Sequence, residues 1–172
     1  MAAAAAQYEK LLRLPEGKEA LEYLRGRGVD DEAIARFNLG YAAGGRGALR
    51  TALERQGVSE DQMVAAGLLI RPDDPSREPY DRFRNRVIFP ITDRRGRIIA
   101  FGGRVMGEGE PKYLNSPETP LFHKGHVLYG MALAQAKARE TGRIIVTEGY
   151  MDVIALHRAG FENTVAPLGT AL

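Results

Sequence analysis

The segment 143–169 constrains the fold of this chain more than any other part of it. It opens with a short apolar run, RIIVT, continues with the helical pattern MDVIALHRAG and ends with a second apolar run, NTVAPLG. A buried strand, a helix and a strand in this order predict two parallel strands joined by a right-handed crossover. Open parallel sheets bind ligands beyond the carboxyl ends of their strands, so we expect a ligand site there.

Two carboxylates lie at the junction between the first strand and the helix. Glu148 is expected at the carboxyl end of the strand and Asp152 in the first turn of the helix, with Gly169 and Thr170 at the same edge. Magnesium prefers a few carboxylate oxygens, with water and substrate phosphate completing its octahedron, so these acids can form half a site. The structural alternative is that Asp152 stabilises the helix dipole and Glu148 is solvated.

Length and composition indicate a globular chain. Its 172 residues, 44% of them hydrophobic, can bury the core of one domain or of two small ones. No apolar run approaches the roughly 18 to 20 residues that span a bilayer, and the first residues do not follow the order of a signal peptide, so no membrane contact is expected. The absence of cysteine excludes disulfides and thiolate metal sites and fits a cytoplasmic protein.

The N-terminal part is expected to be a helical scaffold. Residues 15–69 carry a helical apolar pattern with a weak repeat, in which Asp30 and Ser59 would cap helices. We interpret the alanine run at 2–6 as a frayed helix end or a segment outside the fold. The turn-rich stretch 71–79 predicts a subdomain boundary.

We therefore expect three parts. They are a mostly helical part at 1–75, an arginine-rich hairpin with a nucleotide or template loop at 76–128, and the first part of a second domain at 129–172.

The predicted hairpin is strongly basic. Segments 86–92 and 97–105 have strand patterns, and Pro90 should place its strand at an edge or at a bulge because proline donates no backbone hydrogen bond. Between residues 82 and 104 the chain has seven arginines and a single acid, Asp93, although its net charge is only +2. This local bias predicts an anionic partner.

Alternation along an extended segment would place Arg82, Arg84 and Arg86 on one exposed face. They could merely face solvent. However, three guanidinium groups on one face repel each other unless an anion relieves them, which favours a nucleic acid or a nucleotide as partner. Arg104 follows two glycines, at 102 and 103, that would let a ligand approach the backbone closely.

The segment 107–125 has three prolines and little periodicity, which is typical of a functional loop. Lys112 and Lys124 could hold phosphate, Tyr113 could stack on a base, and Asn115 could form hydrogen bonds with one. The alternative is that Tyr113 and its neighbour Leu114 anchor the loop to the core.

The order of these motifs resembles the catalytic core of bacterial DNA primases of the DnaG type. The resemblance rests on YDRFRNRVIFPITDRRGRIIAFGGRV, PKYLNSPETPLFHKG and VTEGYMDVIALHRAGFENTVAPLGTAL, and it covers most of the chain. The acidic element is shared with topoisomerases and other Toprim proteins, whereas the hairpin and the PKYLNSPET block are specific to primases. The resemblance implies an α+β fold leading into α/β: an N-terminal helical and mixed-sheet subdomain followed by a truncated Toprim-like parallel βαβ unit.

What the resemblance implies is a DNA-dependent RNA polymerase. It would synthesise RNA primers on single-stranded DNA during replication, from ribonucleoside triphosphates, by metal-assisted nucleotidyl transfer. Glu148 and Asp152 match the first acidic Toprim motif, so they would be catalytic and would bind Mg²⁺ or Mn²⁺. Template and nucleotide would contact a basic set of residues: Arg82, Arg84, Arg104, Lys112, Tyr113, Asn115 and Lys124.

Parts of the family pattern are missing from this sequence. They are the zinc-binding module, the later Toprim carboxylates and the region that binds the replicative helicase. We therefore interpret the chain as a fragment with an incomplete metal site, inactive by itself. Two alternatives stay open: a non-catalytic module that binds single-stranded nucleic acid, and another Toprim enzyme such as a topoisomerase or nuclease. No nucleophilic tyrosine is identified for a topoisomerase, and the PKYLNSPET block favours primase.

Overall fold

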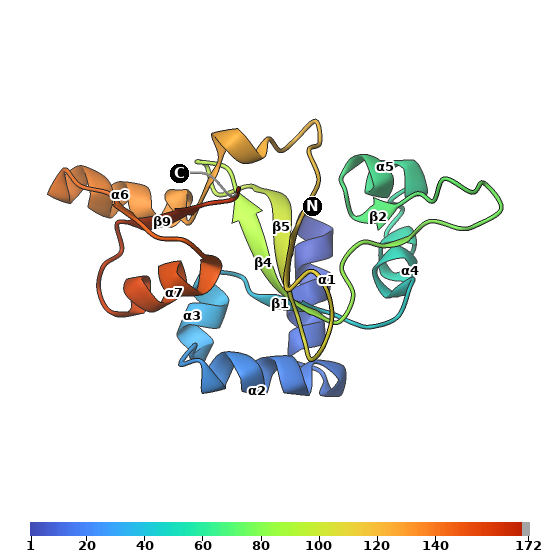
Figure 1. Cartoon of the computed structure of the whole chain (residues 1–172), viewed down its shortest axis with the longest axis horizontal. Coiled ribbons are helices and arrows are strands. Elements are labelled where there is room, and N and C mark those ends of the chain that lie inside the picture. The colour runs from blue at the N-terminus through green and yellow to red at the C-terminus, as the bar shows by residue number, and fades with distance from the viewer. Residues whose placement is uncertain (170–172) are drawn as a thin grey trace.

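The computed structural model describes residues 1–169, which form three β-sheets surrounded by helices (Figure 1). The main sheet has the order β1-β4-β5-β6, and each neighbouring pair is antiparallel. The predicted hairpin is confirmed, with a turn in which the N–H of Gly96 donates to the carbonyl of Asp93. The strands of this sheet are β1 (Gly40–Ala42), β4 (Arg86–Thr92), β5 (Ile98–Val105) and β6 (Tyr113–Asn115).

A small second sheet lies beside the main one. Its strands β2 (Leu69–Ile70) and β3 (Tyr80–Asp81) are antiparallel. The turn-rich segment 71–79 therefore connects two strands of one sheet. The division of the chain into three parts stays a prediction.

The third sheet confirms the strand-helix-strand unit. Strand β9 (Thr164–Pro167) lies between β7 (Leu128–Tyr129), which is antiparallel to it, and β8 (Ile145–Val146), which is parallel to it. Helix α7 (Tyr150–Arg158) joins β8 to β9. The predicted fold class is thus confirmed, while Thr170 lies outside the described residues.

The expectation of a buried first strand was wrong. In the described part of the chain β8 pairs only with β9, and Ile144 and Val146 are about half exposed. The apolar run could not distinguish an edge strand from a central one, because both have the same local sequence pattern.

The helices pack against all three sheets, and both predicted caps are confirmed. Asp30 accepts the N–H of Ala33, and Ser59 forms a capping box with Gln62. The expected helical stretch is interrupted by β1, which pairs with the start of β4. The remaining helices are α1 (Ala2–Leu12), α2 (Lys18–Gly26), α3 (Asp31–Arg36), α4 (Ala48–Glu54), α5 (Glu60–Ala65) and α6 (Met131–Thr141), with short 3₁₀ turns at Pro15–Gly17 and Lys124–His126.

The alanine run belongs to the core, so its interpretation as a frayed end or an outside segment was wrong. Ala4, Ala5 and Tyr8 are buried in α1, which packs against β1. The Tyr8 ring meets the Phe101 ring edge-on, with 5.3 Å between the centroids. Small side chains let this helix approach the sheet closely, and a run of alanines has no apolar periodicity that would reveal its buried face.

The hairpin β4/β5 lies in the middle of the molecule (Figure 1). Its side chains belong to two hydrophobic clusters. Along β4, Val87 and Phe89 belong to the cluster shared with α2, α3 and α7, whereas Ile88 belongs to the cluster shared with α1, α4 and α5. Successive side chains of a strand point to opposite faces, so both faces of β4 are buried. The first cluster includes Tyr150 and therefore joins the main sheet to the strand-helix-strand unit.

Pro90 occupies a place where its missing N–H is tolerated. Strand β4 is central, but its pairing with β1 ends at Ile88, two residues before the proline. The register towards β5 shifts between Ile91 and Thr92. The expectation of an edge or a bulge therefore holds locally rather than for the whole strand.

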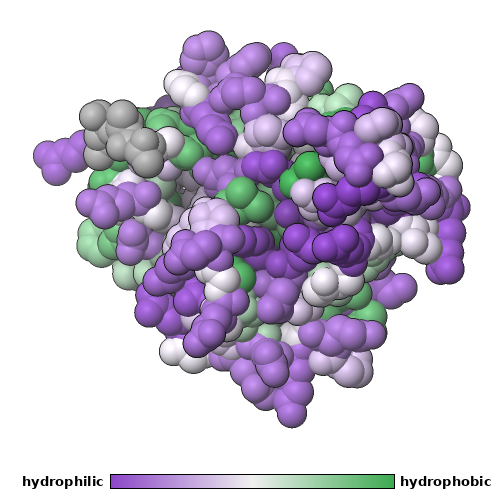
Figure 2. All heavy atoms as spheres, turned by 45° about the vertical axis from the view of Figure 1, so that its right-hand side comes forward, coloured by the Kyte–Doolittle hydropathy of each residue, from purple (hydrophilic) through white to green (hydrophobic). Residues whose placement is uncertain are grey.

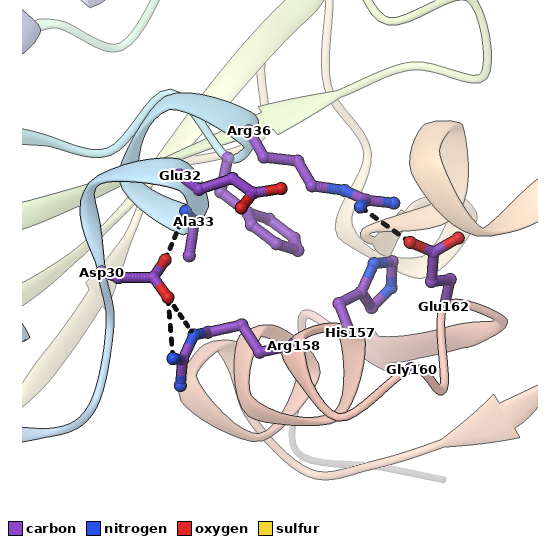
Figure 3. A pocket seen from close by; sticks show the side chains of 9 residues that line it. Asp30, Glu32, Ala33, Arg36, His157, Arg158, Gly160 and Glu162 are labelled. Atoms are coloured by element: carbon purple, nitrogen blue, oxygen red, sulfur yellow. Dashed lines mark hydrogen bonds and ion pairs between the residues drawn. The ribbon is translucent and has the colours of Figure 1, made fainter.

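Helices α3 and α7 meet around a pocket of about 280 Å³ (Figure 3). Asp30 pairs with Arg158 and Arg36 pairs with Glu162, each at 2.7 Å, across the two segments. His157 is buried between them, and its Nε2–H donates to the carbonyl of Thr164 at 2.9 Å. These contacts hold α7 against the N-terminal half of the chain.

His157 should make the chain less stable in mild acid. Its Nδ1 is buried without a partner among the described residues, and burial lowers its pKa. The hydrogen bond to Thr164 and the charge of Glu162 oppose this shift, and Arg36 adds to it, but burial is the largest cause. The unfolded histidine, with a pKa of about 6.5, binds a proton first as the pH falls. The stabilisation is therefore present above about pH 6.5 and lost below it, by about 1.4 kcal/mol for each unit by which burial lowers the pKa.

Urea unfolding of the chain at pH 7.5 and pH 5.5 measures this effect. The loss of unfolding free energy should shrink in the His157→Gln variant and persist in His126→Gln, which removes an exposed histidine. Equal losses in all three proteins would show that His157 does not carry the pH dependence.

The surface is expected to be mostly hydrophilic, because 27% of the residues are charged. Figure 2 shows a mostly hydrophilic face on which hydrophobic residues occupy small, separate areas. Within residues 1–169, none of the helices is both long and apolar enough to cross a membrane.

Candidate functional site

A pocket of about 540 Å³ lies where the main sheet meets the strand-helix-strand unit. It contains four of the predicted site residues: Tyr113 and Asn115 from β6, and Glu148 and Asp152 from the turn that begins α7. Residues 166–169, at the carboxyl end of β9, complete the wall. The structure therefore has a hollow at the edge of the sheet where a ligand site was expected.

Both acids are exposed close to the junction between β8 and α7. Glu148 comes two residues after β8 ends, and Asp152 lies in the first turn of α7, as predicted. The Asp152 Oδ2 atom is 3.5 Å from the position that a Cβ atom on Gly149 would take, so this carboxylate folds back towards the turn that carries Glu148.

These acids fit half of a magnesium or manganese site. Carboxylate oxygens are the hard ligands that such ions prefer, and an open remainder of the shell suits water and phosphate. Residues 1–169 contain no group of three or more His, Cys, Asp or Glu side chains arranged for a metal ion. The donor set is therefore compatible with the expected ion but supplies only part of its coordination.

Asn115 is hydrogen-bonded on three sides within the protein. Arg82 donates to its main-chain carbonyl through Nε at 3.2 Å and Nη2 at 2.7 Å. Tyr150 Oη donates to its Oδ1 at 2.6 Å, and its Nδ2 donates to the carbonyl of Leu168 at 2.9 Å. The amide that was expected to contact a base is engaged inside the protein in this structure.

The two glycines before Arg104 make room for side chains of the protein rather than for a ligand. A Cβ atom on Gly102 would collide with the ring of Tyr150, and one on Gly103 would press against Phe83 and Arg86. The expectation of ligand approach at this point was wrong. The sequence shows that a close approach is possible, but not which group makes it.

The three arginines at 82, 84 and 86 do not form one exposed strand face, so this expectation was also wrong. Arg86 is buried, and its Nη1 donates to the carbonyls of Gly103 and Lys112. Arg82 and Arg84 lie in the connection between β3 and β4, where Arg84 stacks over the ring of Tyr80 at 5.3 Å. Burial lowers the pKa of both Arg82 and Arg86, and neighbouring arginines lower it further.

Tyr113 lines the pocket, and Arg104 lies beside it in the main sheet. They are register partners on β5 and β6, and the Arg104 guanidinium lies 4.2 Å above the ring of Tyr23. Tyr113 is 42% exposed and stacks on Tyr150 at 6.3 Å, and partial burial raises its pKa. Leu114 packs on the core and fits the anchoring alternative. Tyr113 is both stacked on Tyr150 and partly exposed, so its contact with a base stays a prediction.

The two predicted lysines lie outside the pocket wall. Lys112 is exposed directly before β6, and its carbonyl accepts the N–H of Val105. Lys124 begins the 3₁₀ turn before β7, where its N–H donates to Glu118. The segment 107–125 is therefore not a simple loop, because β6 within it extends the main sheet.

Arg27 is a pocket residue that sequence reasoning missed. It follows the last residue of α2, is exposed, and lines the pocket together with Tyr113 and the two acids. The sequence pattern indicated only a helix end between Gly26 and Gly28. Arg27 lies far from the other site residues along the chain, so no sequence pattern indicates that it shares a site with them.

Comparisons with known proteins agree with this architecture. Residues 7–135 match the DNA primase catalytic core, N-terminal domain, and residues 142–172 match the Toprim domain. The DNA primase of Pseudomonas aeruginosa is 52% identical over 172 residues, which are 99% of this chain and 26% of that protein. The chain thus spans about a quarter of the length of this curated relative.

Solved structures show the same fold. The RNA polymerase domain of Mycobacterium tuberculosis primase DnaG, solved with a double-stranded DNA oligomer with a 6-nucleotide overhang, has a TM-score of 0.93 and 37% identity over 99% of this chain and 53% of that one. A DnaG primase catalytic domain bound to ssDNA has a TM-score of 0.88 and 46% identity, again over 99% and 53%. The resemblance found in the sequence is confirmed, and the chain belongs to the DNA primase family.

Proposed function

We propose that this chain supplies the first acidic motif and part of the template surface of a primase active site. The complete enzyme would join ribonucleotides from their triphosphates into RNA primers on single-stranded DNA. The observation that carries the proposal is the pocket itself, which is lined by Glu148, Asp152, Tyr113 and Arg27.

The division of roles follows from charge. Glu148 and Asp152 would hold a Mg²⁺ or Mn²⁺ ion, which supplies charge neutralisation for phosphoryl chemistry when bound. Arg27 and Arg104 would attract the phosphates of the template, and Tyr113 would stack on a base. Arg84, Lys112 and Lys124 would extend the basic surface away from the pocket.

The pocket favours this function over a module that only binds nucleic acid. Two exposed carboxylates facing the same hollow as Arg27 would repel phosphate and weaken binding. They become useful when a divalent cation bridges carboxylate and phosphate oxygens. Catalysis therefore explains the acids, whereas binding alone does not.

Replacing Arg27 with Gln should weaken binding of single-stranded DNA and reduce its dependence on salt. Each phosphate contact contributes a slope of about −0.7 in a plot of log K against log salt, so the slope should become shallower by about that amount. The measurement is fluorescence anisotropy with an oligodeoxynucleotide over a salt series. It uses a chimaera in which this chain replaces the matching segment of the Pseudomonas aeruginosa primase.

Arg95→Gln is the matched control. Arg95 is exposed at the β4/β5 turn, at the end of the hairpin away from Arg104 and Tyr113. Its replacement with glutamine removes the same charge as Arg27→Gln. Its slope should stay close to that of the unmodified chimaera. Equal slopes for the two variants would mean that Arg27 acts only through net charge.

A further inference from the structure

Asn115 joins four separate segments of the chain at the wall of the pocket. Arg82 holds its carbonyl from the connection before β4, Tyr150 reaches its Oδ1 from α7, and its Nδ2 reaches Leu168 after β9. Asn115 itself belongs to β6, where it pairs with Gly102 of the hairpin. This network therefore ties the strand-helix-strand unit to the main sheet.

Tyr150 is the member of this network closest to the acids along the chain, two residues after Glu148 and two before Asp152. Its ring stacks on Phe89 at 4.8 Å and meets Tyr129 edge-on at 4.6 Å. Packing thus fixes the ring, and the hydroxyl adds a directed contact that fixes the first turn of α7. That turn contains Asp152, and Glu148 lies two residues before the helix begins.

Tyr150 borders the pocket but presents little surface to a substrate. It is only 7% exposed, and its hydroxyl is already bonded to Asn115. Arg82 likewise directs two nitrogen atoms at the carbonyl of Asn115 rather than at the open pocket. We therefore expect Tyr150 and Arg82 to affect the reaction by positioning other residues.

We propose that Tyr150 is a positioning residue that, through Asn115, sets the placement of Glu148 and Asp152 against the template surface. Arg82 has the same role. It holds the main-chain carbonyl of Asn115, whereas Tyr150 holds the side chain, and it acts on Asn115 rather than on the template. The inference rests on the proposed function and extends it by assigning roles to two residues outside the reacting groups. A misplacement of about 1 Å can cost about 100-fold in rate, so one hydroxyl can matter this far from the chemistry.

The test is Tyr150→Phe in the chimaera, which keeps the ring and removes only the hydroxyl. We expect kcat for primer synthesis to fall by about tenfold or more and the magnesium concentration for half-maximal rate to rise. The Kd for Mn²⁺, measured by calorimetry, should weaken as well. The melting temperature and the Kd for single-stranded DNA should stay close to those of the unmodified chimaera.

Tyr129→Phe is the matched control. Tyr129 is a neighbour in the same aromatic cluster, and its buried hydroxyl has no partner among the described residues. Its removal should change neither kcat nor the two metal measurements. The double variant Tyr150→Phe/Asn115→Ala should lose no more activity than Asn115→Ala alone, because both changes break one network.

Two results would overturn the inference. One is an unchanged kcat, magnesium requirement and Mn²⁺ affinity in Tyr150→Phe. The other is a loss of activity that follows a lower melting temperature while the metal measurements stay unchanged, which would show a structural role. If the unmodified chimaera bound Mn²⁺ but made no primer, the proposed function would fail, and the Mn²⁺ affinity of Tyr150→Phe would still decide the inference.

Discussion

Replacing Glu148 with Gln in the chimaera should lower primer synthesis by about 100-fold or more, because a bound cation contributes several kcal/mol to phosphoryl transfer and about 1.4 kcal/mol corresponds to a tenfold change in rate. Glutamine keeps the shape of the side chain and removes the charge that holds the ion. Glu148 is exposed on its turn, so the change should not disturb packing.

Binding and folding distinguish this loss from a general defect. The Kd for single-stranded DNA should stay the same or tighten, because one negative charge leaves a pocket that faces phosphate. Glu108→Gln, which neutralises an exposed glutamate in the segment before β6, should leave the rate of primer synthesis unchanged. A Glu148→Gln variant with nearly the original rate would place the metal on other residues.

Features encoded by neighbouring residues could be predicted from the sequence. The hairpin follows from two strand patterns around a turn, and the caps at Asp30 and Ser59 follow from polar side chains at helix starts. The strand-helix-strand unit and the positions of Glu148 and Asp152 follow from a change of apolar period within one short segment.

Features that depend on distant partners could not be predicted. Arg86 looked like one member of an exposed arginine series, yet two carbonyls from β5 and the residue before β6 hold it in the interior. Gly102 looked like a place for a ligand, yet the ring of Tyr150 fills the space. In each case the residue type indicates which contacts are possible, and tertiary packing determines which partner makes the contact.

The site itself was only partly visible for the same reason. Glu148, Asp152 and Tyr113 carry chemistry that their residue types reveal, and the structure brings them to one pocket. Arg27 joins them from the end of α2, and no pattern in the sequence connects it with the hairpin. Arg82 shows the opposite case, a conspicuous arginine whose guanidinium donates to a main-chain carbonyl of the protein itself.

The 172-residue chain by itself should make no primer, whereas the chimaera should make primers. Residues 1–169 offer two carboxylates in the pocket and no metal group of three or more such ligands. Magnesium gives up its waters reluctantly, so a half-site should exchange the ion freely. Carboxylates from the remainder of the Pseudomonas aeruginosa primase would complete the coordination in the chimaera.

The central claim is that this chain provides the first acidic motif of a primase active site, and primer synthesis by the chimaera tests it most directly. The assay measures labelled ribonucleotide incorporated into short RNA on a single-stranded DNA template. We predict Mg²⁺-dependent product from the chimaera, a loss of about 100-fold or more in its Glu148→Gln variant, and none from the 172-residue chain. Product from the chain alone that survives Glu148→Gln, or a folded chimaera without product, would contradict the claim.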